Sequence, residues 1–158
     1  MNDYYSAMTS TIGEIHIVTQ GDFVVGLLWN KKSVARLFPQ YTQQETILHK
    51  KAKKQISRFL NGELYQFDLP IKLIGTPFQK AVWQELLKIP YGETKSYSEI
   101  ANAIKNAKAV RAVGAANGKN KISIIIPCHR VIGKNGTLTG FAGGLTIKER
   151  LLVLEQNY

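Results

Sequence analysis

The feature that most constrains the fold is the segment Thr76-Pro77-Phe78-Gln79. Thr76 can cap a helix, Pro77 fits the first helical position, and Gln79 completes a capping box. The first 30 residues carry strand signals, whereas the segments after residue 76 begin with helix signals. The sequence therefore predicts an α+β chain with two lobes, an N-terminal structural domain at 1–74 and a mostly helical C-terminal domain at 75–158.

Short runs of alternating apolar residues mark three strands at the start of the chain. They cover residues 4–9, 13–19 and 23–29, and glycines at positions 13 and 21 supply the turns. An antiparallel meander is expected. Helices are predicted at 32–38 and 43–60, followed by a linker strand at 69–75.

Two further helix signals lie close together in the C-terminal domain. Ser96-Tyr97-Ser98-Glu99 is a second capping box, and Asn106 is expected to cap another helix that ends at Gly118. Two helices joined by about three residues in a basic region predict a helix-turn-helix. Helical hairpins are also common in proteins that bind no DNA, so the pattern alone leaves both interpretations open.

The charge of the chain points to the class of partner. The net charge is +10, and residues 105–134 contain seven Lys or Arg and no acidic residue. Such a surface favours an anionic polymer as partner. Solubility alone is the competing explanation.

The second helix of this pair has an unusual composition. Val110 and Val113 can face the core, which leaves another side formed by Ala107, Arg111, Gly114, Ala115 and Gly118. Glycine inside a helix costs about 1 kcal/mol relative to alanine, so Gly114 indicates a close approach to the backbone. Tight packing on a neighbouring helix is the alternative for Gly114, and a solvated charge is the alternative for Arg111.

Composition excludes several other classes. No apolar run approaches the roughly 20 residues of a membrane span, and the first ten residues lack the features of a signal peptide. We therefore expect an intracellular protein, cytoplasmic or, in a eukaryote, nuclear, with no membrane partner. One cysteine forms no internal disulfide, and His16, His49 and His129 have no metal-site spacing, so we expect no metal, no cofactor and a monomer.

The single cysteine follows an apolar segment. Residues 122–126 are expected to form a buried strand that ends in Pro127-Cys128-His129-Arg130-Val131. A thiol beside His129 and Arg130 can have a lowered pKa and act as a nucleophile. An inert core cysteine is the alternative.

At this point the chain resembles the methylated-DNA–protein-cysteine methyltransferases, also called O6-alkylguanine-DNA alkyltransferases. The matching motifs keep the family's spacing from about Tyr97 to Glu155, whereas the first lobe resembles the family's ribonuclease-H-like domain only in its order of elements. The motifs are Arg111-Ala112-Val113-Gly114, Asn120, Ile126-Pro127-Cys128-His129-Arg130-Val131, Gly143-Gly144-Leu145, Lys148-Glu149 and Glu155.

The resemblance implies irreversible transfer of an alkyl group from O6 of guanine, and possibly O4 of thymine, in double-stranded DNA to Cys128. Arg111 is implied to fill the gap left by a flipped nucleotide, Tyr97 to donate a proton to the base, and His129, oriented by Glu155, to act on Cys128 through water. The implied catalytic residues are Cys128, His129, Glu155, Tyr97 and Asn120; the DNA contacts are Arg111, Tyr97, Ser96, Ala109, Val110, Gly114 and Lys134; the substrate pocket comprises Asn117, Pro127, Val131, Phe141, Ala142, Gly143 and Lys148.

The last helix places Glu155 in an unusual position. Thr146-Ile147-Lys148-Glu149 is expected to start this helix as a capping box, so Glu155 falls at the negative end of the helix dipole. A cationic His129 beside it accounts for that placement.

Three residues depart from the commoner family pattern. Lys121 stands where proline is frequent, Phe141 where tyrosine is frequent, and Ala142 where some members have serine. The preferred alkyl group therefore stays open. Two other functions share parts of this pattern, a binder of alkylated bases without repair activity and a cysteine hydrolase. The acceptor Cys128 argues against the first, and the basic helix-turn-helix argues against the second.

Overall fold

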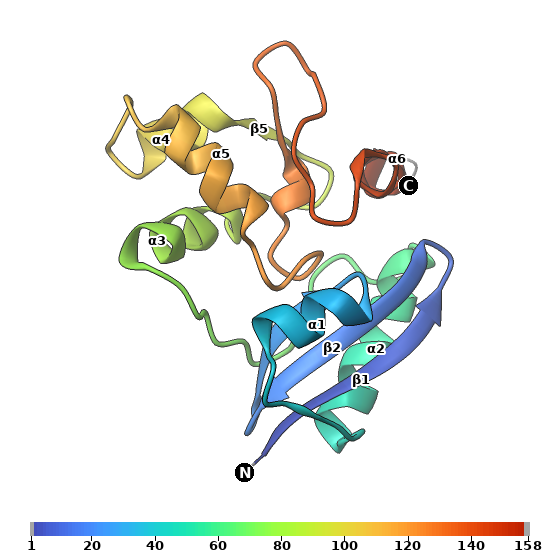
Figure 1. Cartoon of the computed structure of the whole chain (residues 1–158). Helices are drawn as coiled ribbons and strands as arrows, with labels where there is room; N and C mark the ends of the chain where they lie inside the picture. Colours follow the sequence, from blue (N-terminus) through green and yellow to red (C-terminus); the bar gives the residue numbers. More distant parts are fainter. Residues whose placement is uncertain (1, 157–158) are drawn as a thin grey trace. The chain divides into compact units, whose positions relative to one another are not determined.

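The computed structural model describes residues 2–156, which fall into two compact units, Met1–Leu73 and Ile74–Tyr158 (Figure 1). The first combines a small sheet with two helices, and the second is mostly helical, as the α+β prediction requires. Within the described residues, no helix is both long enough and apolar enough to cross a membrane.

The sheet of the first unit has the strand order β3-β2-β1-β4. The strands β1 (Asp3–Ser10), β2 (Gly13–Gln20) and β3 (Phe23–Leu28) form the predicted antiparallel meander, which is confirmed. The short strand β4 (Thr42–Gln43) pairs in parallel with β1. The linker strand predicted at 69–75 is wrong apart from a single bridge between Ile71 and Val24.

Two helices cover the sheet. The helix α1 (Lys31–Leu37) contacts β2 and β3, while α2 (Ile47–Leu60) contacts β1 and β2. The predicted start of α2 at residue 43 is wrong, because that residue pairs in β4 and the helix begins only after Thr46, whose side chain forms a capping box with His49. The sheet is thus buried where the helices lie on it, and β2 is buried from Ile15 to Thr19.

In the second unit, α3 (Pro77–Leu86) is fixed to α5 (Val110–Gly118) by Trp83. Trp83 is almost fully buried, and its Nε1 donates a 2.8 Å hydrogen bond to the Ala116 carbonyl. A side chain at Gly75 would meet the same indole ring at 2.6 Å, so this position requires glycine. The capping box of Thr76 and Gln79 is present as predicted.

The predicted helix pair is present with a longer connection. Ser96 caps α4 (Tyr97–Ala103) in the expected box with Glu99. The cap predicted at Asn106 is wrong, since α5 begins only at Val110, after Ala109. Asn106 lies in the preceding turn, where its carbonyl accepts a hydrogen bond from the Ala109 N–H. The end at Gly118 is confirmed.

The remaining elements lead to the C-terminal helix. The strand β5 (Lys95–Ser96) pairs in parallel with β6 (Val131–Ile132), which follows the 3₁₀ helix η1 (Cys128–Arg130). The helix α6 (Leu145–Gln156) closes the described chain. Because α6 already includes Thr146, the capping box predicted there is wrong, although Glu155 does lie in the last turn.

Candidate active site

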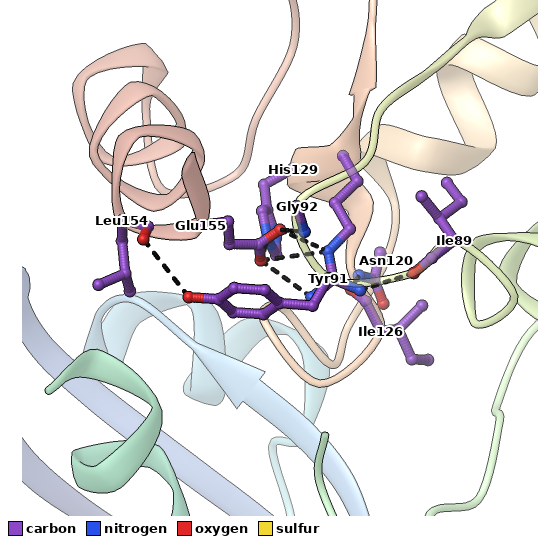
Figure 2. A network of polar contacts seen from close by, with 9 residues as sticks. Ile89, Tyr91, Gly92, Asn120, Ile126, His129, Leu154 and Glu155 are labelled. Atoms are coloured by element: carbon purple, nitrogen blue, oxygen red, sulfur yellow. Dashed lines mark hydrogen bonds and ion pairs between the residues drawn. The ribbon is translucent and has the colours of Figure 1, made fainter. Parts of the chain in front are cut away.

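A compact buried loop leads to the cysteine in place of the predicted strand. Residues 122–126 fold into turns, with Ile124 at φ +71° and the Ile126 N–H bonded to the Ile122 carbonyl. Asn120 holds the loop at both ends: its Oδ1 accepts the Ile122 N–H at 3.0 Å, and its Nδ2 donates to the Ile126 carbonyl at 2.9 Å. Figure 2 shows the second contact. The side chain of Asn120 therefore supplies partners that a sheet would otherwise provide.

Cys128 begins η1 and is 3% exposed. Burial raises the pKa of its thiol, and the opposing effects of Asn120, Lys148 and Ser123 offset this only in part. The Asn117 amide also donates to the Cys128 carbonyl at 3.4 Å. The thiol is thus a protonated group in a closed, polar-lined position, and it needs a base before it can react.

His129, which follows Cys128 in the chain, forms a buried pair with Glu155. His129 Nε2 lies 2.6 Å from Glu155 Oε2, and the two side chains point toward each other in Figure 2. Burial alone raises the pKa of Glu155, but hydrogen bonds from His129 and Arg130 outweigh it and hold the pKa at about 2. Glu155 is therefore an anion at neutral pH.

The contact with Glu155 selects one tautomer of His129. An ionised carboxylate only accepts hydrogen bonds, so Nε2 carries the proton. His129 Nδ1 is buried and has no hydrogen-bond partner among the described residues, which leaves its lone pair available. Burial lowers the pKa of His129, and the charges of Arg130 and Lys148 lower it further, while Glu155 raises it. The imidazole is neutral and can accept a proton at Nδ1.

The backbone between Cys128 and His129 differs from the extended geometry expected. The two residues follow each other in a 3₁₀ turn, with about three residues per turn, so their side chains leave the backbone in different directions. Cys128 and His129 therefore do not continue the strand that the sequence predicts for residues 122–126.

Lys148 connects the site to the loop that precedes α6. Its side chain is fully buried, and Nζ donates to the carbonyls of Val131 at 2.6 Å and Thr139 at 2.8 Å. Burial lowers the pKa of Lys148. Tyr97 reaches the same loop, because its hydroxyl contacts Thr139 Oγ1 at 2.9 Å, and its ring faces Lys148 Nζ at 6.0 Å.

The helix-turn-helix exposes the side predicted to meet DNA. Arg111 is exposed on α5, and Ala109 and Val110 are half-buried at its start. A methyl group built on Gly114 would lie 3.9 Å from the Tyr97 ring, an ordinary contact, so tight packing does not explain this glycine. Ser96 caps α4, and Lys134 is exposed on the loop after β6.

The predicted pocket residues occupy two places. The first place is around Cys128 and holds four buried residues. Pro127 and Val131 are near Cys128 in the chain, Asn117 donates to the Cys128 carbonyl, and Lys148 donates to the Val131 carbonyl. Phe141, Ala142 and Gly143 lie on the loop before α6, where Phe141 and Gly143 are half-buried and Ala142 is exposed. The departing residue Lys121 donates from Nζ to the Ile74 carbonyl at 3.0 Å.

Two residues of this site have effects that the sequence did not predict. Ser123 lies in the buried loop and lowers the pKa of the Cys128 thiol, and Arg130, expected only to act on that thiol, bonds to Glu155. The adjacency of Arg130 to His129 was the available signal, but nothing local indicates that a surface-type residue is buried. Within the described residues, no group of three or more His, Cys, Asp or Glu side chains is placed to hold a metal ion.

Comparison with known proteins adds independent evidence. Residues 77–157 match the family model described as 6-O-methylguanine DNA methyltransferase, DNA binding domain. A methylated-DNA–protein-cysteine methyltransferase of Methanosarcina acetivorans is 47% identical over 96% of this chain and 97% of its own length. The corresponding protein of Haemophilus influenzae is 45% identical over 97% of this chain and 86% of its own length.

Solved structures agree with this match. The Mycobacterium tuberculosis protein OGT in complex with DNA superimposes with a TM-score of 0.91 at 42% identity, covering 98% of this chain and 93% of that one. An O6-methylguanine-DNA methyltransferase from Pyrococcus kodakaraensis, 23% identical, has a TM-score of 0.71 over 96% of this chain and 98% of its own and shares the fold.

Proposed function

Because the chain belongs to the methylated-DNA–protein-cysteine methyltransferase family, we propose that it repairs DNA by moving the alkyl group of O6-alkylguanine onto Cys128. The observation that carries this proposal is the buried His129–Glu155 pair, in which His129 directly follows the cysteine in the chain and its Nδ1 has no hydrogen-bond partner among the described residues. No cofactor enters the reaction, since the protein itself is the acceptor.

Duplex DNA is the partner, and α4 and α5 are its binding elements. The exposed Arg111 enters the space left when the damaged nucleotide turns out of the stack, because a paired guanine hides O6 from the thiol. Ser96, Ala109, Val110, Gly114 and Lys134 contact the backbone around it. Gly114 leaves room beside Tyr97 for this approach.

The chemical step is a displacement at saturated carbon. The Cys128 proton moves to His129 Nδ1 through one water molecule, and Glu155 stabilises the imidazolium that forms. The Cys128 Sγ–C bond forms while the C–O6 bond breaks, and the electron pair goes to the guanine ring. Tyr97, released from Thr139, protonates that ring, so guanine leaves as a neutral base.

The product limits each molecule to one reaction. A thioether has no electrophilic carbonyl for water to attack, in contrast to an acyl-enzyme. Nothing in the site therefore regenerates the thiol, and the protein acts as a stoichiometric reagent. O4-alkylthymine, with a similar exocyclic oxygen, is a second candidate substrate, and a monomer in the cytoplasm, or in the nucleus if the source is eukaryotic, is the proposed working form.

A titration with substrate tests the proposal. Duplex DNA containing O6-methylguanine is added in increasing excess, and the repaired lesions are counted when the reaction stops. Repair is expected to end at about one lesion per protein molecule, and a Cys128→Ala variant is expected to repair none. Continued turnover, or repair by the alanine variant, would contradict the mechanism.

A further inference from the structure

All three guanidinium nitrogens of Arg130 donate hydrogen bonds within the protein. Its Nε donates to Glu155 Oε1 at 2.8 Å and to Oε2 at 3.1 Å, and Nη2 donates to Oε2 at 2.9 Å. The remaining Nη1 donates to the Ile89 carbonyl at 2.7 Å. The side chain is 9% exposed, and its guanidinium carbon lies 5.7 Å from the centre of the Tyr91 ring. The guanidinium is therefore fixed in one orientation.

Glu155 is consequently shared between two neighbouring residues. Its Oε2 accepts from His129 and from Arg130, while Oε1 accepts from Arg130 and from the Gly92 N–H at 3.1 Å. Figure 2 shows the dashed lines that join the Glu155 carboxylate to its neighbours. A carboxylate hydrogen-bonded to one histidine alone would stabilise the protonated form of that histidine most strongly. Here the permanent cation of Arg130 neutralises part of the negative charge of Glu155, so protonated His129 is stabilised less.

We propose that Arg130 is a positioning residue that holds Glu155 in place as an anion while keeping His129 neutral until it accepts the proton of Cys128. This inference rests on the proposed function, because it concerns the base that deprotonates Cys128. It adds to that function an account of how Glu155 can orient His129 without raising the pKa of His129 so far that the ring is already protonated before the reaction.

The charges around His129 support this role. The ionisable groups that act on His129 are Glu155 and Lys148 from α6 and Arg130 from η1; Cys128 precedes it in the chain, and Tyr91 contacts Arg130 through its ring. The set contains one anion and two cations, and the thiol is neutral. A third positive charge on His129 is therefore disfavoured before reaction, in agreement with the lowered pKa of His129.

The test is the pH dependence of the reaction rate with O6-benzylguanine as the free base, which needs no DNA contact. Arg130→Met removes the cation and leaves Glu155 with His129 and the Gly92 N–H as its hydrogen-bond donors, so the midpoint of the acid limb is expected to move upward by at least about one pH unit. Arg130→Lys keeps the cation and is expected to leave the midpoint near that of the wild type, even if the rate falls. Arg150→Met, an exposed change of equal charge on α6, is the control and is expected to have no effect on the midpoint.

Two results would overturn the proposal: a lower rate at every pH with an unchanged midpoint in Arg130→Met, or an equal shift in Arg130→Lys and Arg130→Met. If Arg130→Met fails to fold, NMR titration of His129 in the wild-type protein decides the matter. A neutral ring at pH 7 supports the proposal, and a protonated ring refutes it. Failure of the proposed function itself would be seen separately, as a wild-type protein that acquires no benzyl group.

Discussion

Asn120 offers a direct way to test how the loop before the cysteine is stabilised. Its side chain is 4% exposed and makes two hydrogen bonds to the backbone of residues 122 and 126. Asn120→Ala leaves the buried Ile122 N–H unsatisfied, while the Ile126 carbonyl keeps the hydrogen bond from the Cys128 N–H. An unsatisfied buried group costs about 1 to 3 kcal/mol and a lost hydrogen bond about 0.5 to 1.5 kcal/mol, so the free energy of unfolding is expected to fall by about 1.5 to 4.5 kcal/mol.

Gln55 provides a matched control in the first unit. Its amide makes the same pair of bonds to one residue, donating to the Asp68 carbonyl at 3.0 Å and accepting the Asp68 N–H at 2.9 Å, but these bonds are exposed. Water replaces them in Gln55→Ala, so the loss is expected to stay below about 1 kcal/mol. Urea unfolding followed by circular dichroism and tryptophan fluorescence measures both variants. Equal losses would refute the reasoning, since burial would then not determine the value of the amide.

Four further predictions concern the reaction and its partner. Arg111→Ala is expected to slow repair of duplex DNA far more than reaction with O6-benzylguanine, because the proposed role of Arg111 is to fill the gap in the stack; equal losses would exclude that role. Glu155→Gln is expected to slow transfer by about 10²-fold or more at nearly unchanged DNA affinity, and to destabilise the fold by about 3 to 5 kcal/mol because Arg130 loses its anion; weaker DNA binding with unchanged transfer would contradict this. Affinity for undamaged duplex is expected to fall steeply with salt, by a slope of about 0.9 per phosphate contacted, and a flat response in a filter-binding titration would count against the basic surface. Alkylation of the buried Cys128 is expected to overpack its site, which lowers the free energy of unfolding by about 1 to 3 kcal/mol and the melting temperature by several degrees. Cys128→Ala is the unreactive control, and an unchanged melting temperature after alkylation would disprove this prediction.

The sequence predicted elements whose signals are local. The capping boxes at Thr76 and Ser96 each act within four residues, and both are present in the structure. The meander at the start of the chain also followed from alternation and turn glycines. Asn106 and Thr146 failed as caps because a capping residue type favours a helix start but does not determine it: the turn at Asn106 continues to Ala109, after which α5 begins without a side-chain cap, and Thr146 lies inside α6.

The site was less accessible to local reasoning. Residues 122–126 match a buried strand in composition, but their backbone partners come from the side chain of Asn120, which no periodicity reveals. Arg130 and Glu155 are separated by 25 residues, so only the tertiary fold brings them together. The expected pairing of His129 with Glu155 came from the family resemblance, and the structure adds the tautomer and the contribution of Arg130.

The most direct test of the central claim is the mass of the protein after reaction. The intact protein is incubated with duplex DNA that contains O6-methylguanine, weighed by mass spectrometry, and digested to locate the change. The account predicts a gain of one methyl group, about 14 Da, on the peptide that contains Cys128, because attack by sulfur leaves the alkyl group bound. Repaired DNA together with an unmodified Cys128 would contradict it.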